Sequence, residues 1–356
     1  MSRMTLAEAF VFNPRVPIAK GAEAAFVDMA ALEPFVRSVS ASIRKPYSSG
    51  TKFVDGDVLM ARITPSLENG KTSIYRNKMN PEEPAFGSTE FIVIRGREGI
   101  SSSRFAYYLF TSNEVRAHAI ASMNGSSGRQ RVQLDSLASY EVDLPSLPVQ
   151  EEVVATLGAL DDKIESNRRA VALISDLIDV QAAELGADLP TVPLGDIATS
   201  FKESVDPSKL GDGIVAHFSL PAFDSGSRPE WVAASTIKSN KLSVPHQAIL
   251  LSRLNPRFNR TWWASVEAET QALASTEFLV LTAEDDLQLA AVWLAIRDPF
   301  FREELPKRVT GTSGSHQRVR PDDALSIEVP NFSNAPTEQI RSTLALLKLA
   351  EVLRAE

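Results

Sequence analysis

The chain has 356 residues, enough for two domains of ordinary size that each bury a hydrophobic core. Its composition, 44% hydrophobic and 23% charged, is typical of a folded globular protein, and no apolar run is long enough to span a membrane. The absence of cysteine excludes disulfides, thiol nucleophiles and thiolate metal sites. The first residues lack the apolar core and cleavage site of a signal peptide, so we expect a cytoplasmic protein.

Residues 1–149 predict a first α/β domain. Short apolar, β-branched runs at 58–63 and 91–95 are bounded by glycine, proline and acidic residues, which favours buried strands. Residues 104–123 have helical spacing and few breakers. Residues 125–131 (GSSGRQR) are small and polar, as in a tight turn, and 140–144 predicts a last short strand.

A long helix is predicted over residues 150–187. Its apolar residues recur at alternating intervals of four and three from Val153 to Leu185, the pattern of a coiled coil. Asn167 and Gln181 occupy the two seam positions that are not apolar. The alternative interpretation is an amphipathic helix that lies on a globular core. Much of the net charge of −8 falls on this segment, so a basic face on each globular half is compatible with the total.

The second half repeats the first. Residues 58–65 (VLMARITP) return as 249–256 (ILLSRLNP), and 88–94 (STEFIVI) return as 275–281 (STEFLVL). The turn at 125–132 returns at 311–319 with one inserted residue. The preserved order and nearly constant spacing indicate a tandem duplication, with a second domain at 188–335. Residues 336–356 begin like the long helix but are shorter, and we expect the two helices to pack antiparallel.

No residue pattern predicts catalysis. The GSSGRQR turn lacks the Gly-Lys-Ser/Thr ending of a phosphate-binding loop, and the four histidines have no metal-ligand spacing. Residues 298–301 (DPFF) match the Asp-Pro-Pro-Tyr loop of adenine methyltransferases only in part, and no glycine-rich cofactor loop precedes them. We therefore expect no catalytic residue, metal or cofactor in this chain.

Four segments together resemble the specificity subunit of type I restriction–modification systems: 56–71, 86–95, 124–132 and 147–167. Each segment alone would be a weak signal, and the resemblance extends over nearly the whole chain. It implies an α/β (α+β) fold class, with two tandem globular target-recognition domains. It also implies helical conserved regions that form an antiparallel coiled coil.

The resemblance further implies a non-catalytic subunit that binds a bipartite double-stranded DNA target. Each domain would read one half-site, and the coiled coil would set the spacing. Two adenine-N6 methyltransferase subunits, and in some complexes two restriction subunits, would carry S-adenosylmethionine, ATP and Mg. The partner-binding residues expected on the long helix are Leu157, Leu160, Ile164, Val171, Ile174 and Ile178. The alternative function is a coiled-coil adaptor that binds protein and has no DNA specificity.

Candidate DNA contacts are loop residues that can reach phosphates or base edges. They are Arg62, Asn69, Lys71, Ser88, Arg129, Gln130 and Arg131 in the first half, and Arg253, Arg257, Asn259, Arg260, His316, Gln317 and Arg318 in the second. Trp262 and Trp263 have the chemistry to stack on a base, but paired aromatics after a strand are more typical of a core.

Some of these candidates have a structural alternative. Arg62 recurs in both halves at a strand end, so an ion pair with Glu90 is the competing interpretation. Arg253 and Glu277 are the matching pair in the second half. Ser88 is more typical of a turn than of a contact.

Overall fold

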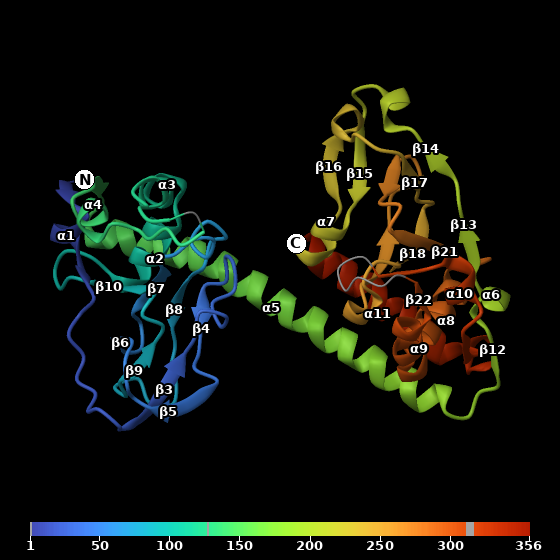
Figure 1. Ribbon diagram of the computed structural model, residues 1–356, viewed down its shortest axis with the longest axis horizontal. Coiled ribbons are helices and arrows are strands. Elements are labelled where there is room, and N and C mark those ends of the chain that lie inside the picture. The colour runs from blue at the N-terminus through green and yellow to red at the C-terminus, as the bar shows by residue number, and fades with distance from the viewer. Residues whose placement is uncertain (1, 127, 311–316) are drawn as a thin grey trace. The chain divides into compact units, whose positions relative to one another are not determined.

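The computed structural model describes residues 2–126, 128–310 and 317–356 (Figure 1). The chain divides into two compact units, Met1–Lys163 and Ile164–Glu356, each with its own hydrophobic core. No helix in the described part of the chain is long and apolar enough to cross a membrane.

Unit 1 is built on two β-sheets. The five-stranded sheet has the order β2 (Phe10–Phe12), β10 (Phe91–Gly96), β7 (Val58–Ala61), β8 (Thr72–Tyr75) and β4 (Ser38–Val39). The four-stranded sheet has the order β5 (Ile43–Pro46), β3 (Glu23–Val27), β9 (Ala85–Gly87) and β6 (Thr51–Phe53). The two apolar runs predicted to be strands are β7 and β10, which are antiparallel neighbours with buried side chains.

Helices cover one sheet of unit 1. α2 (Ser103–Thr111) packs on β7, β8 and β10, and α3 (Asn113–Ala121) follows it. The single helix expected over 104–123 is therefore two helices. Ser112 separates them because its hydroxyl accepts a hydrogen bond from Val115 N and caps α3. The remaining elements are α1 (Leu6–Ala9), α4 (Leu134–Ala138), and the paired strands β1 (Ser2–Thr5) and β11 (Glu141–Leu144).

Unit 2 repeats this topology. Its four-stranded sheet has the order β13 (Thr199–Phe201), β21 (Phe278–Thr282), β18 (Gln247–Ser252) and β19 (Thr261–Ser265). Its five-stranded sheet has the order β14 (Ser204–Val205), β17 (Lys241–Ser243), β20 (Ala272–Ala274), β15 (Ile214–Phe218) and β16 (Glu230–Ala233). β15 and β20 run parallel, as β3 and β9 do in unit 1. The duplication detected in the sequence is thus a duplication of strand order, and the fold class is confirmed.

The other elements of unit 2 surround these sheets. The helices are α6 (Leu194–Ile197), α7 (Leu220–Asp224), α8 (Asp286–Arg297), α9 (Pro299–Glu304) and α10 (Pro321–Leu325). The short strands are β12 (Thr191–Pro193), β22 (Val309–Thr310), β23 (Arg318–Val319) and β24 (Glu328–Pro330). The 3-10 turns are η1 (Pro207–Leu210), η2 (Ala234–Thr236), η3 (Pro256–Phe258), η4 (Leu305–Arg308) and η5 (Phe332–Asn334).

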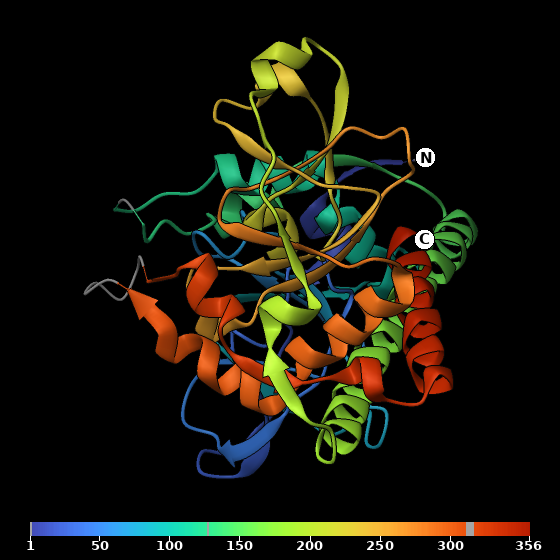
Figure 2. The same ribbon diagram turned by 90° about the vertical axis from the view of Figure 1, so that its right-hand side faces the viewer.

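The long helix α5 (Leu147–Gly186) ends in unit 2, where it packs beside α11 (Thr337–Ala355) (Figure 2). Asn167 Nδ2 donates to the carbonyl oxygen of Leu353 at 3.2 Å, and Thr343 Oγ1 donates to Gln181 Oε1 at 3.3 Å. Because the earlier residue of α5 meets the later residue of α11, the two helices are antiparallel. Both polar seam positions therefore connect the helices.

The same stretch of α5 also lies on a globular core. Ile174 and Ile178 are buried in a cluster that includes residues of α11 and of α8, whose side chains are buried from Leu289 to Ile296. An amphipathic helix on a core and an antiparallel helix pair are therefore both correct for this segment. The reason is that α8 is apolar on all sides and needs cover from both helices.

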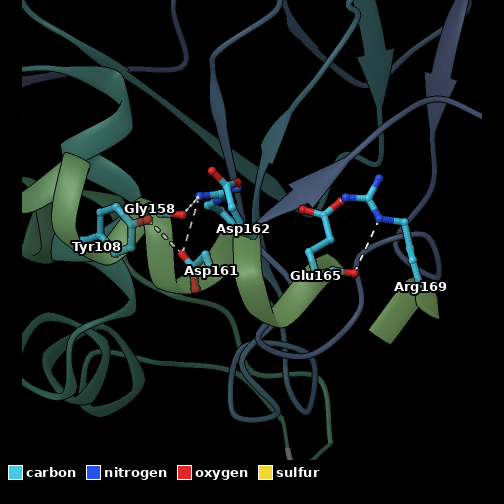
Figure 3. A network of polar contacts seen from close by, with 7 residues as sticks. Tyr108, Gly158, Asp161, Asp162, Glu165 and Arg169 are labelled. Atoms are coloured by element: carbon cyan, nitrogen blue, oxygen red, sulfur yellow. Dashed lines mark hydrogen bonds and ion pairs between the residues drawn. The ribbon is translucent and has the colours of Figure 1, made fainter. Parts of the chain in front are cut away.

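The first stretch of α5 is attached to unit 1 by polar contacts (Figure 3). Arg37 Nη1 donates to the carbonyl oxygen of Gly158 at 3.0 Å, and its Nη2 donates to Asp162. Tyr108 Oη donates to Asp161 Oδ2 at 2.8 Å. These contacts hold the helix by its polar side, while Val154 and the first seam residue, Val153, pack on the core of unit 1.

Candidate nucleic-acid interface

Two sequence motifs of unit 1 meet in one loop junction. Ile63 and Arg131 form an antiparallel β-bridge. Thr64 N donates to the carbonyl oxygen of Gln130 at 3.0 Å, and Val132 N donates to that of Arg62 at 2.8 Å. The loop that follows β7 and the turn that precedes α4 are therefore joined by their backbones, although Thr64 and Gln130 are 66 residues apart in the chain.

An ion pair fixes this junction to the start of β10. Arg131 donates to Glu90 through both Nε (3.0 Å) and Nη2 (2.6 Å), a bidentate geometry that suits a carboxylate. These bonds hold the pKa of the Glu90 carboxyl below its ordinary value. Arg62 donates its backbone N–H to the Glu90 carbonyl oxygen at 2.9 Å. The acid thus pairs with Arg131, not with Arg62, the partner that the sequence suggested.

Unit 2 builds the same ion pair. Arg318 donates to Glu277 through Nε (2.8 Å) and Nη2 (2.7 Å), and Arg253 donates its backbone N–H to the Glu277 carbonyl oxygen at 2.8 Å. The Arg253 guanidinium donates to the carbonyl oxygen of Thr276 at 2.6 Å. As in unit 1, the arginine that the sequence suggested as the partner, Arg253, contacts the strand through its backbone. Arg318, which is distant in the chain, pairs with Glu277.

The backbone pairing is also repeated in unit 2. Leu254 and Arg318 form a β-bridge, and Asn255 N donates to the carbonyl oxygen of Gln317 at 2.9 Å. Two similar sequences therefore place two different loops, 64–71 and 255–260, on equivalent supports. We call the support built by Glu90, Arg131 and the paired backbones of unit 1 the Glu90 junction. Its counterpart, built by Glu277 and Arg318, is the Glu277 junction.

Several predicted contacts in unit 1 have structural roles. The Ser88 hydroxyl accepts from Glu90 N at 3.1 Å, as expected of a turn residue. Lys71 Nζ donates to the carbonyl oxygen of Met29 at 3.0 Å, so its charge is used within the unit. Asn69 and Arg129 are exposed, and Gln130 is half-buried.

In unit 2 the predicted loop forms the turn η3. Arg260 pairs with Asp224 through Nε (2.7 Å) and Nη2 (2.9 Å), whereas Arg257 is exposed. Asn259 adopts a left-handed backbone with φ 42°, and its Oδ1 accepts from Thr261 Oγ1. His316 lies outside the described residues, and Gln317 is half-buried. Trp262 and Trp263 are buried in the cores of unit 2, so the core interpretation is confirmed.

One feature of η3 was missed in the sequence. Phe258 is 56% exposed, and the guanidinium groups of Arg257 and Arg260 lie 4.8 Å and 5.1 Å from its ring centroid. An exposed ring between two cations is suited to contact a nucleotide, because the ring can stack while the cations face phosphates. The signal was the sequence RFNR, in which an aromatic stands between arginines.

Comparisons with known proteins identify the family. Residues 36–174 match the type I restriction modification DNA specificity domain. This part of the chain is similar to a type I restriction–modification DNA specificity domain. The resemblance predicted from the sequence is therefore confirmed, and both predicted loop segments of the Glu90 junction lie inside the matched range.

Individual relatives of this specificity domain agree. The type I restriction enzyme EcoAI specificity subunit of Escherichia coli is 29% identical over 126 residues, 35% of this chain and 20% of that protein. The EcoEI specificity subunit of Escherichia coli is 26% identical over 165 residues, 44% of this chain and 27% of that protein. The chain thus spans about a quarter of the length of these relatives in the matched region.

The fold also has a solved counterpart. The crystal structure of the type I restriction-modification system S subunit from M. genitalium matches with a TM-score of 0.50 and 11% sequence identity. The match covers 99% of this chain and 94% of that one. It extends the similarity of fold beyond the matched specificity domain to the whole chain.

The predicted partner-binding residues of α5 differ in exposure. Leu157, Leu160 and Ile164 are 38%, 56% and 42% exposed. Ile174 and Ile178 are buried against α8 and α11, and Val171 packs at the edge of that cluster. Of these six side chains, only the earlier three are available at the surface of the chain, since the later ones already contact its own core.

Two observations concern the metal sites and the DPFF sequence that were considered for catalysis. Among residues 2–126, 128–310 and 317–356, no group of three or more histidine and acidic side chains could hold a metal ion. Asp298 is buried, and its Oδ1 accepts from Phe300 N at 2.9 Å. The DPFF sequence is therefore the N-terminal cap of α9, with the proline in the first turn of the helix.

Proposed function

We propose that this chain is the DNA sequence-recognition subunit of a type I restriction–modification complex, and that each unit reads one half of a bipartite duplex target. The subunit is non-catalytic. Adenine-N6 methyltransferase subunits, and restriction subunits where present, carry S-adenosylmethionine, ATP and Mg. The specificity-domain match and the names of the relatives support this proposal.

The observation that carries it is the pair of equivalent junctions. Each junction fixes a loop to a β-sheet through a bidentate arginine–glutamate pair and backbone hydrogen bonds. The loops themselves differ: 64–71 is TPSLENGK and 255–260 is NPRFNR. A repeated support with different loop sequences is what a subunit needs in order to read two different half-sites with one architecture.

The geometry divides the predicted DNA contacts into two groups. Arg131, Arg318 and Arg260 are held by carboxylates, and we assign them to positioning of the loops. Arg129 and Arg257 are exposed cations with no carboxylate partner among the described residues, and we assign them to the DNA backbone. Base readout then falls to other loop side chains, such as Asn69 and those of η3.

We further propose that the exposed seam residues of α5 bind a modification subunit. Leu157 and Leu160 are exposed on the stretch of α5 that Arg37 and Tyr108 hold through Gly158 and Asp161. Exposed leucines at this spacing form an apolar stripe that suits a helix of a partner.

The test is assembly of the full chain with an adenine methyltransferase subunit, followed by measurement of duplex DNA binding at several salt concentrations. Sequence-specific binding with a steep salt dependence is expected, because several phosphate contacts release counterions. A complex that forms but binds all duplexes equally weakly, with a shallow salt dependence, would instead indicate a protein-binding adaptor.

A further inference from the structure

A cavity of about 140 Å³ lies inside unit 2, where α5, α8 and α11 meet β19. Its walls include the polar side chains of Ser175, Arg297 and Arg354 and the rings of Trp263 and Trp293. It adjoins a larger, open pocket of about 790 Å³, and the two share Trp263 and Arg354. Neither pocket contains Glu277 or Arg318, and of the proposed DNA-reading loop 255–260 only Asn259 reaches the cavity wall.

Two buried donors at this cavity have no acceptor. Trp263 is 2% exposed and Trp293 is 7% exposed, and the indole Nε1 of each lacks a hydrogen-bond partner. The rings pack edge to face, with centroids 5.9 Å apart. An unpaired buried N–H group is costly, so the Trp293 indole calls for an acceptor, whereas the Trp263 indole has the Glu351 carboxyl nearby.

The cavity also has more positive than negative charge. Arg297 donates through Nε to Asp179 Oδ1 (2.5 Å) and through Nη2 to Ser175 Oγ (2.7 Å), and neither bond uses its Nη1. Arg302 donates to the same oxygen of Asp179 at 2.7 Å. One carboxylate therefore accepts hydrogen bonds from two guanidinium groups, and Asp176 acts on Arg297 only through its charge.

Arg354 adds a second guanidinium to the cavity wall. It makes no hydrogen bond or ion pair in the described part of the chain. Burial, together with repulsion from Arg297, lowers its pKa. Glu351, an acid that acts on Arg354, is half-buried, and burial raises the pKa of its carboxyl to about 7, so it compensates Arg354 incompletely at neutral pH.

We propose that this cavity binds a phosphate-type oxyanion, held by the guanidinium groups of Arg297 and Arg354 and by the indole N–H groups of Trp263 and Trp293. Such an anion supplies acceptors for both indoles and relieves the repulsion between the two arginines. The adjoining pocket, which includes Trp231 and Phe218, leaves room for an attached planar group. The ligand is thus either free phosphate or the phosphate of a mononucleotide. This site does not depend on the proposed DNA recognition.

The experiment is a fluorescence titration of the full chain, since three of its four tryptophans line the cavity. The probes are sulfate, inorganic phosphate and AMP, each at constant ionic strength with chloride as the reference. A saturable change is expected for the oxyanions and not for chloride. Tighter binding of AMP than of phosphate would identify the ligand as a nucleotide, and equal binding would identify a free oxyanion.

Variants test whether the fluorescence change arises from binding in the cavity. Arg354→Gln should weaken binding about tenfold, and Trp293→Phe should weaken it as well, because it keeps an aromatic ring but removes the donor. Arg341→Gln, which changes an exposed arginine of α11, is the matched control and should bind as the wild type does. Circular dichroism establishes that each variant is folded. If Arg354→Gln does not fold, Trp293→Phe decides alone.

Two results would overturn the proposal. The first is a wild-type titration in which sulfate, phosphate and AMP give the same response as chloride. The second is wild-type affinity in a folded Arg354→Gln or Trp293→Phe variant. Loss of DNA binding by the complex would not affect either readout, because no DNA is present.

Discussion

Glu90 and Glu277 occupy equivalent positions, each at the start of a buried strand. Each forms an ion pair with an arginine that is distant in the chain. The carboxylate links the strand to that arginine side chain, so its charge helps to hold the loop support together. Both ion pairs are partly exposed, which limits their contribution to stability while leaving their geometric effect on the loops.

Glu90→Gln should loosen the Glu90 junction without unfolding unit 1. The amide has one acceptor oxygen and no charge, so it cannot replace the bidentate pair, and we expect a local loss of about 1 kcal/mol. Hydrogen exchange should accelerate by roughly fivefold at the amides of Thr64 and Val132. The matched control is Glu98→Gln, an exposed acid in a turn. Unchanged exchange at both amides would show that the backbone alone holds the loops.

Arg257→Ala tests the exposed cation of η3. If Arg257 contacts a phosphate, its loss should weaken DNA binding by the assembled complex about equally for all sequences and reduce the salt slope by about 1. Arg129→Ala should behave in the same way from unit 1. Arg341→Ala is the control, because that arginine is exposed on α11. A salt slope identical to that of the control would exclude Arg257 from the interface.

Glu351 should make the stability of unit 2 depend on pH. Burial raises its pKa from 4.5 to about 7, against the opposing effects of Arg354, Lys348 and the nearby indole N–H of Trp263. A raised pKa means that the folded state favours the protonated carboxyl. Its stabilisation is therefore complete below pH 4.5 and is lost as the pH rises through 7.

Glu351→Gln should remove this dependence, because the amide is neutral at every pH. The melting temperature of the variant minus that of the wild type should increase between pH 4.5 and pH 8 and then stay constant. Glu338→Gln, an exposed acid of the same helix, should show no such trend. A difference that does not vary with pH would place the Glu351 carboxyl in a water-like environment.

At the scale of elements, α5 is held differently along its length. Arg37 binds the polar side of its first stretch, whereas Ile174 and Ile178 bury the apolar side of its last stretch. Asn167 and Gln181, which interrupt the seam, hydrogen-bond to α11. Polar groups at such positions fix the register of paired helices, because a shifted register would leave them buried without partners.

Arg37→Met should release the first stretch of α5 from unit 1. The side chain is only 15% exposed, and the substitution removes its hydrogen bonds to Gly158 and Asp162 while keeping an aliphatic chain. We expect a local loss of about 2 kcal/mol, typical of charged hydrogen bonds, with faster exchange across residues 150–163. Arg15→Met, at an exposed arginine, is the control. Equal exchange in both variants would mean that Val154 and Gln150 hold the helix alone.

Gln150 has a structural role at the start of α5 that the sequence does not indicate. Its side chain is fully buried and donates to the carbonyl oxygens of Ile100 and Pro145 at 3.0 Å and 2.9 Å. Its Oε1 accepts from Ser102 N at 3.0 Å. One side chain thus satisfies three backbone groups where α5 begins. A lone glutamine in a charged helical segment gives no indication of this role.

For the whole molecule, the sequence predicted the repeated architecture well because the same apolar strands recur in the same order. The strands β7, β10, β18 and β21 were recognised by their buried, β-branched residues. β3 and β15 pair with strands far away in the chain, so local pattern alone did not indicate them.

The candidate site was predicted less completely, for a physical reason. The motifs that meet at each junction were identified, yet the choice of Arg131 over Arg62 as the partner of Glu90 depends on three-dimensional geometry. The cavity in unit 2 combines residues from α5, α7, α8, α11 and β19, and its unpaired indoles are defined only by what surrounds them. Patterns along the chain carry neither kind of information.

The most direct test of the central claim is the sequence of the methylated sites produced by this chain with an adenine methyltransferase subunit. Single-molecule sequencing of DNA from cells that contain both proteins should reveal one methylated motif with two specific halves separated by unspecified bases. The motif should be absent when this chain is omitted. A single uninterrupted motif, or the same methylation without this chain, would contradict the account.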